Sequence, residues 1–179
     1  MKIICDTRQK AGKHENIDKY FERNGIETEQ KALKIGDYMV DGGSVVIDTK
    51  ADLQEVYGNL IHDHDRFRRE CIRAKEAGIR LIILVEQAGV ETLEDVKTWE
   101  NPRIAEYNWA LEHGLRVAKA PPISSKRLYG IMKTMSELYN CSWEFCSKRS
   151  TGKRIVELLV LRKGGDGEWD IKETKAENS

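Results

Sequence analysis

Apolar and polar residues recur along the chain with two different periods, which separate predicted strands from predicted helices. The short runs 2–6, 45–50 and 141–147 are apolar and bounded by turn-forming residues, which is typical of strands. Residues 79–86 are apolar almost throughout, as expected of a central strand covered on both faces. The stretch 27–40 contains further strand-like pieces.

Helical spacing of apolar residues fills the segments between these strands. Helices are predicted over 14–25, 51–61, 65–78, 124–139 and 151–161. Strands that alternate with helices in this way predict an α/β fold, with a mixed central β-sheet flanked by helices.

The length of 179 residues suits one domain with a substantial core, which we expect over residues 1–161. Residues 87–122 interrupt the alternation with an acidic segment and an amphipathic piece, and we expect them to form an insertion. An added clamp, a partner surface and a plain surface insertion all fit this pattern. Residues 162–179 are polar and predict a C-terminal tail.

Composition favours a soluble protein of the cytoplasm. Hydrophobic residues make up 40% of the chain and charged residues 34%. No apolar run approaches the roughly 20 residues of a membrane-spanning helix, and the first residues do not form a secretory signal. The four cysteines form no CxxC pair, so we expect reduced thiols rather than a zinc site.

Charge is balanced overall, with 30 basic and 30 acidic residues, but it is unevenly distributed. Between residues 119 and 154, eight basic residues stand against two acidic ones, a net charge of +6. A basic lobe of this kind can bind a polyanion, although a solvated helix face gives the same pattern. The candidates for phosphate contacts are Lys126, Arg127, Lys148, Arg149, Lys153 and Arg154.

The strand at 45–50 begins with apolar residues and ends in Asp48, Thr49 and Lys50. The preceding residues 41–44, Asp-Gly-Gly-Ser, predict a hairpin with a two-residue Gly-Gly turn at its tip. That register pairs Asp37 with Asp48 on one face, with their Cβ atoms about 5 Å apart. A slip of one residue would send one carboxylate to the opposite face.

Two facing carboxylates repel each other unless a cation lies between them or one is protonated. Hard oxygen ligands of this kind suit Mg²⁺, for which Mn²⁺ could substitute. Alternation along the strand puts Lys50 on the face of Asp48 and points Thr49 away. Lys50 could then orient a water molecule or stabilise charge on a phosphate. Asp6, which ends the first strand, could reach the same edge.

Five short motifs resemble, in order and spacing, those of XPF-type nuclease domains. These domains are the structure-specific endonuclease branch of the PD-(D/E)XK, or restriction-endonuclease-like, superfamily. The resemblance covers about residues 2–86 and 123–160. The motifs are CDTR (5–8), IGDY (35–38), VVIDTK (45–50), DRFRRECIRA (65–74) and RLIILVE (80–86).

The resemblance implies a metal-dependent DNA endonuclease that cuts at flaps, forks or other duplex/single-strand junctions. It implies that Asp37 and Asp48 are metal ligands and that Lys50 is the catalytic lysine. Asp6 and Arg8 match the Asp-x-Arg pair of the first strand, which makes Asp6 a further metal-ligand candidate. In the helix that follows, Arg66 matches a phosphate-binding arginine. Arg69 or Arg73 on a neighbouring turn could extend that DNA contact.

The chain departs from the family pattern at two positions of the motif VVIDTK (45–50). Asp48 stands where the family usually has Glu, and Thr49 stands where it has Arg. The tandem helix-hairpin-helix module that the family often carries is not found in the sequence. A catalytically inactive scaffold, a junction resolvase and a sequence-specific endonuclease on the same fold therefore remain alternatives. The expected partners are branched DNA and a second copy of the chain in a homodimer, but no membrane.

Overall fold

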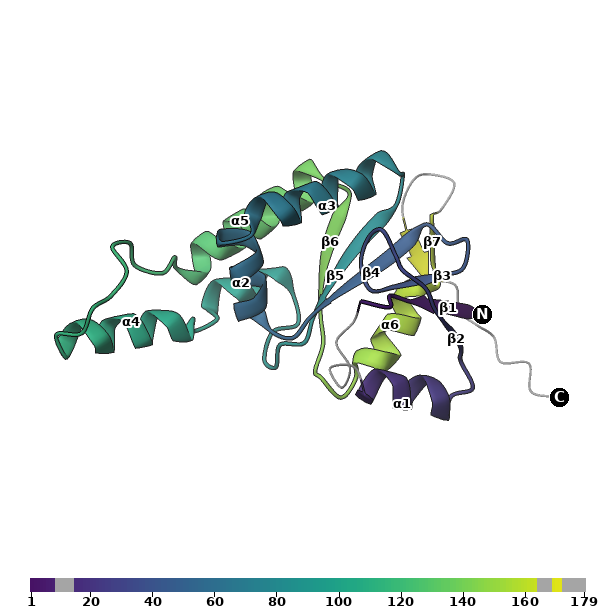
Figure 1. The fold of residues 1–179 in the computed structure, drawn as a ribbon, viewed down its shortest axis with the longest axis horizontal. Helices are drawn as coiled ribbons and strands as arrows, with labels where there is room; N and C mark the ends of the chain where they lie inside the picture. Colours follow the sequence, from purple (N-terminus) through teal and green to yellow (C-terminus); the bar gives the residue numbers. More distant parts are fainter. Residues whose placement is uncertain (9–14, 164–168, 172–179) are drawn as a thin grey trace.

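A computed structural model describes residues 1–8, 15–163 and 169–171. Its main feature is a six-stranded sheet in the order β2-β1-β3-β4-β5-β6 (Figure 1). Neighbouring strands are parallel in the pairs β1–β2, β4–β5 and β5–β6, whereas β3 is antiparallel to both β1 and β4. The strands are β1 (Lys2–Cys5), β2 (Glu27–Gln30), β3 (Tyr38–Val40), β4 (Val45–Lys50), β5 (Arg80–Val85) and β6 (Cys141–Phe145).

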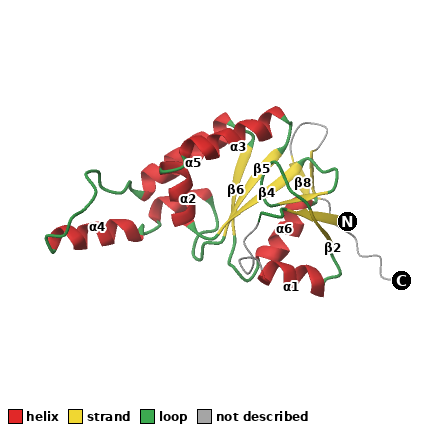
Figure 2. Cartoon of the chain, viewed as in Figure 1, coloured by secondary structure: helices red, strands yellow, loops and turns green. Residues whose placement is uncertain are grey.

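Helices cover both faces of this sheet, which confirms the predicted fold class (Figure 2). One face packs against α1 (Glu15–Arg23) and α6 (Thr151–Leu159). The other packs against α2 (Leu53–Ile61), α3 (His64–Glu76) and α5 (Ser125–Leu138). Each of these helices lies within about two residues of the range predicted from apolar spacing.

Strand β5 explains why the sheet needs helices on both sides. Leu81 and Ile83 point into the cluster under α2, α3 and α5, whereas Ile82 and Leu84 point into the cluster with α1 and α6. All four side chains have 0% exposure. Burial of both faces removes the usual alternation of polar residues, so the strand reads as a continuous apolar run.

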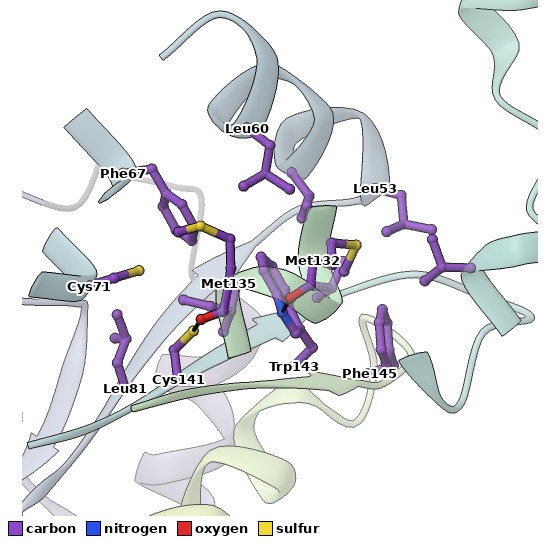
Figure 3. Packing of buried hydrophobic residues seen from close by; sticks show 14 of the residues in the cluster. Leu53, Leu60, Phe67, Cys71, Leu81, Met132, Met135, Cys141, Trp143 and Phe145 are labelled. Atoms are coloured by element: carbon purple, nitrogen blue, oxygen red, sulfur yellow. Dashed lines mark hydrogen bonds between the residues drawn. The ribbon is translucent and has the colours of Figure 1, made fainter. Parts of the chain in front are cut away.

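The cluster on the α3 side fixes that helix over the sheet (Figure 3). The ring centroids of Phe67 on α3 and Trp143 on β6 lie 6.0 Å apart. The buried indole Nε1 of Trp143 donates a 2.9 Å hydrogen bond to the carbonyl oxygen of Met132 on α5. This packing holds three elements together, and one of them, α3, also faces the candidate site.

The β3–β4 hairpin has the predicted register but a different turn. Tyr38 pairs with Ile47 and Met39 with Val46, as the predicted register requires. Asp37 departs from that register, because its N–H donates a 2.7 Å hydrogen bond to the carbonyl oxygen of Ile47 instead of pairing with Asp48. The turn's hydrogen bond runs from the Gly43 N–H to the Val40 carbonyl, at 2.8 Å, so Asp41 and Gly42 are its central residues. The expected turn centred on both glycines was therefore wrong. Ser44 joins the loop and restores the register.

The region 87–122, predicted to be an insertion, divides into two parts. Val90 and Val96 are buried in the α3-side cluster, and Val96 belongs to the 3-10 helix η1 (Leu93–Thr98). Helix α4 (Pro102–Glu112) has no buried residue and extends away from the sheet (Figure 1). The first part belongs to the core, and only α4 with its flanking loops projects.

The segment predicted to be a polar tail contains two strands, β7 (Leu161–Lys163) and β8 (Trp169–Ile171). They form a separate antiparallel pair, in which Leu161 lies opposite Ile171. Residues 164–168 and 172–179 of the expected tail lie outside the described residues. Within the described ranges, no helix is long and apolar enough to cross a membrane.

Candidate active site

The polar end of β4 lines a cavity of about 750 Å³. The lining comes from the segment that follows β1, the loop that leads into β3, the end of β4, and helices α2 and α3. Lys50 is the last residue of β4 and pairs with Val85 at the end of the parallel strand β5. The chain then passes through a short loop into α2, which begins at Leu53. The lining residues are Asp6, Arg8, Lys34, Gly36, Asp37, Asp48, Thr49, Lys50, Glu55, Asn59, Arg66, Glu70 and Arg73.

Asp48 and Lys50 form a buried ion pair at the base of this cavity. The Lys50 Nζ donates a 2.8 Å hydrogen bond to Oδ1 of Asp48 and lies 2.6 Å from Oδ2. The contact with Oδ2 lacks hydrogen-bond geometry, which leaves that oxygen buried without a hydrogen bond. Residues two apart on a strand share a face, as the sequence predicted for this pair.

Burial is the main influence on the Asp48 carboxyl group and raises its pKa to about 7. The charge of Lys50 opposes this shift, whereas the charges of Asp37 and Glu70 add to it. For Lys50, burial lowers the pKa, but Asp48 and further acidic groups outweigh it, so the net shift is upward. Lys50 is therefore a cation at neutral pH in this arrangement.

Asp37 directly precedes β3 and lines the same cavity as Asp48. Its Oδ2 accepts a 2.8 Å hydrogen bond from the backbone N–H of Thr49 and a second one from the Thr49 hydroxyl. The expectation that Thr49 points away from the carboxylates was wrong. Strand alternation predicts only the direction of the Cα–Cβ bond of Thr49. The Thr49 hydroxyl lies beyond that bond and still reaches the carboxylate of Asp37.

Asp6 reaches the same cavity, but its carboxylate has other partners. Its oxygens accept hydrogen bonds from Arg8 Nε, the shorter at 2.9 Å, and from the N–H of Leu33 at 3.0 Å. Arg8 also donates to the carbonyl oxygen of Leu33. Asp6 and Arg8 thus fix the loop after β2, and a metal ligand role for Asp6 stays a prediction.

Helix α3 presents three side chains to the cavity, Arg66, Glu70 and Arg73. Their spacing of four and three residues places them on one helix face. Arg69, the predicted DNA contact, is exposed but does not line the cavity, whereas Arg73 does. The sequence interpretation missed Glu70, whose Oε1 accepts a 3.0 Å hydrogen bond from the N–H of Gly36. Its helical spacing from Arg66 was the signal for it.

Comparison with known proteins gives the chain its family. A model of the ERCC4 domain matches residues 5–159. The chain belongs to the ERCC4 domain family. This match confirms the resemblance to XPF-type nuclease domains, and the matched range includes all of the cavity-lining residues. No curated protein sequence matches the chain.

Two solved structures share the fold of this ERCC4 domain. XPF from Aeropyrum pernix has a TM-score of 0.58 and 16% sequence identity, covering 89% of this chain. The same XPF in complex with DNA has a TM-score of 0.57 and 17% identity, covering 88% of this chain. The chain matches only 63% and 62% of the length of those two proteins.

The remaining basic residues predicted to bind DNA lie elsewhere on this ERCC4 domain. Lys126, near the start of α5, lines a separate cavity at the base of α4. Arg154 is ion-paired with Glu144 at 2.8 Å and with Glu157 at 3.0 Å, and Lys153 lies 3.6 Å from Glu157. In the part of the chain that the structure describes, none of the six basic candidates between 126 and 154 lines the carboxylate cavity.

The donor set of this ERCC4 domain fits a hard divalent cation. Asp48 Oδ2 is buried without a hydrogen bond, and Asp37 supplies a second carboxylate nearby. Residues 1–8, 15–163 and 169–171 contain no group of three or more His, Cys, Asp or Glu side chains that could hold a metal. Mg²⁺ typically takes one or two carboxylates and keeps several water molecules, so a two-carboxylate site is suited to it.

Proposed function

We propose that this ERCC4 domain is a Mg²⁺-dependent endonuclease that hydrolyses DNA phosphodiester bonds at branched structures such as flaps and forks. The observation that supports it best is the convergence of Asp37, Asp48 and Lys50 in one cavity. Membership of the ERCC4 domain family supports the same activity. Mn²⁺ is expected to substitute for Mg²⁺.

In this proposal, Asp37 and Asp48 hold the metal ion. When bound, the ion would polarise the phosphodiester and supply an activated water molecule. Lys50 balances the charge of Asp48 through their 2.6 Å contact. As a cation beside the metal-binding carboxylate, Lys50 would stabilise negative charge that develops on the phosphate or orient the attacking water molecule.

Basic side chains at the rim of the cavity would hold the DNA backbone on either side of the scissile phosphate. Arg66 and Arg73 come from α3, Arg8 follows β1, and Lys34 lies in the loop after β2. The Arg66 guanidinium is exposed and its contacts with described residues are long, 3.3 Å to Oδ1 of Asn59 and 3.8 Å to Asp63, so it is accessible to a phosphate. DNA as the partner is also supported by the XPF from Aeropyrum pernix, which was solved in complex with DNA.

The test is to incubate the protein with Mg²⁺ and labelled linear duplex, splayed-arm, flap and four-way-junction DNA. Wild type should cut the splayed-arm or flap substrate. Asp48→Asn and Asp37→Asn should each reduce the rate by about 100-fold or more while DNA binding is largely retained. Asp41→Asn, an exposed carboxylate in the turn of the same hairpin, is the matched control and should cut like wild type.

The outcomes separate the alternatives. Binding of branched DNA without cutting of any substrate would favour a scaffold module. Cutting of the four-way junction alone would favour a resolvase, and cutting of linear duplex at one sequence would favour a sequence-specific endonuclease. Cleavage by Asp48→Asn at the wild-type rate would overturn the site assignment itself.

A further inference from the structure

Thr49 is the residue of the site for which the family pattern offers no role, since it stands where the family has Arg. Its side chain is 4% exposed and lies in the wall of the carboxylate cavity. It donates two hydrogen bonds to the same oxygen of Asp37, one from its backbone N–H and one from its hydroxyl. A threonine confined in this way can act on the geometry of Asp37.

The bend before β3 explains why Asp37 accepts these bonds. Just before β3, the Asp37 N–H donates to the Ile47 carbonyl of β4 at 2.7 Å. Gly36 then turns the chain away with a φ of +62°. Thr49 lies two residues after Ile47 on β4, so its backbone N–H points toward the same neighbouring strand as that of Ile47. If β3 were longer, one of its carbonyl oxygens would accept this N–H. The Asp37 carboxylate takes the place of that carbonyl.

Asp37 is therefore anchored from two sides. The N–H of the preceding Gly36 donates to Glu70 on α3, at 3.0 Å, which fixes the backbone. The two donors of Thr49 fix the carboxylate, because both act on Oδ2 and thereby set the direction of the other oxygen. Threonine is stiff at χ1, so its hydroxyl is held in position before any ligand arrives.

We propose that Thr49 is a positioning residue that orients the Asp37 carboxylate for the divalent cation, through its hydroxyl as well as its backbone N–H. This inference rests on the proposed function, because it takes Asp37 to be a metal ligand. Partners that orient a metal ligand typically change metal affinity by about 10- to 100-fold when they are removed. The Thr49 backbone donor survives any side-chain substitution, so we expect the lower end of that range.

The test compares Thr49→Val, which removes the hydroxyl at nearly constant shape, with Thr49→Ser, which keeps it. Mn²⁺ affinity is measured by calorimetry well below the unfolding temperature, with Asp37→Asn as the reference for a lost ligand. Thr49→Val should weaken Mn²⁺ binding by about tenfold, and Thr49→Ser by no more than about threefold. Thr134→Val, at an exposed threonine of α5 outside the cavity, is the matched control and should bind Mn²⁺ like wild type.

Cleavage measured in parallel separates this inference from the proposed function. Thr49→Val should raise the metal concentration for half-maximal cleavage by about tenfold and largely keep the rate at saturating metal. If Thr49→Val binds Mn²⁺ as tightly as wild type while Asp37→Asn does not, the positioning role is wrong and the nuclease function stands. If Thr49→Val weakens binding but wild type cuts no DNA, the positioning role stands and the nuclease function fails. If wild type shows no Mn²⁺ binding that depends on Asp37, both are wrong.

Discussion

Gly36 sets the bend that brings Asp37 against β4, and Gly36→Ala tests how much the site depends on it. Gly36 has a φ of +62°, a region in which a side chain costs roughly 1–2 kcal/mol. A Cβ at this position would lie 2.3 Å from Cγ1 of Val46 and 2.8 Å from the carbonyl oxygen of Ile47. Both distances are far below van der Waals contact, and the second involves backbone that cannot rotate away.

Gly42 in the adjacent turn provides the matched control. It has a similar φ of +70°, but a Cβ there would have no neighbour within 4 Å. Gly42→Ala should therefore lose only the backbone contribution, about 1–2 kcal/mol of unfolding free energy. Gly36→Ala adds the cost of forcing atoms into a packed region, about 1–3 kcal/mol, for a total of roughly 2–5 kcal/mol.

The assay is equilibrium denaturation by urea, followed by circular dichroism, together with a Mn²⁺ titration of each variant. Gly36→Ala should be less stable than Gly42→Ala by about 1–3 kcal/mol and should lose Mn²⁺ affinity, because Asp37 moves with the bend. Gly42→Ala should bind Mn²⁺ like wild type. Equal destabilisation by the two substitutions would refute the claim that close contact with β4 enforces the bend.

Two further predictions concern the pKa of Asp48 and the packing around glycines of α5 and α6. Burial raises the pKa of Asp48 to about 7, and a metal binds its ionised form, so Mn²⁺ affinity should rise up to about tenfold per pH unit below pH 7 and level off above it. Calorimetry in buffers with different ionisation enthalpies measures the accompanying proton release, and a pH-independent affinity between about pH 6 and 8 would contradict the shift. Gly152 on α6 contacts Tyr20 on α1, and a Cβ would lie 2.7 Å from the Tyr20 Cβ, so Gly152→Ala should destabilise the domain by about 1–3 kcal/mol. Gly130→Ala on the exposed side of α5, with no neighbour within 4 Å, should instead stabilise it by about 0.5–1 kcal/mol, and thermal unfolding of both variants checks the opposite signs.

The prediction that Asp37 and Asp48 lie close together depended on the register between β3 and β4. Turn residues and strand lengths make the register of a hairpin predictable from sequence. Asp37 opposite Asp48 was expected from the hairpin. Tyr38 opposite Ile47 confirms the register within the strands, whereas the Asp37 N–H bonds to the Ile47 carbonyl and so departs from it by one residue. The turn itself differs, because the hydrogen bond closes on Gly43 rather than on the residue expected. The loop between Val40 and Val45 contains four residues, Asp41 to Ser44, instead of a two-residue turn flanked by one further pair. Both arrangements give the same register for the strands, so the strand pairing was predicted correctly although the turn was not.

The basic residues were less predictable, since charge along a sequence does not say which helix face or which side of the sheet carries it. Arg73 rather than Arg69 lines the cavity, because the tilt of α3 over the sheet selects one face of the helix. Arg154, expected to contact phosphate, is ion-paired with Glu144 from β6, ten residues earlier in the chain. Such pairings depend on how α6 packs across the sheet.

Local pattern alone determined the strands of the main sheet, most of the helices, the face shared by Asp48 and Lys50, and the family, but not the β7–β8 pair. These features rest on interactions between residues close in sequence, or on a hairpin with a short turn. Only the tertiary structure decided which partners the polar side chains have. Asp6 accepts hydrogen bonds from Arg8 and from the loop after β2. Thr49 donates to the Asp37 carboxylate because the chain joins β3 only after the bend at Gly36, so no residue of β3 pairs with Thr49. The hydrogen-bond partner at a strand end depends on where the neighbouring strand stops, which no single stretch of sequence specifies.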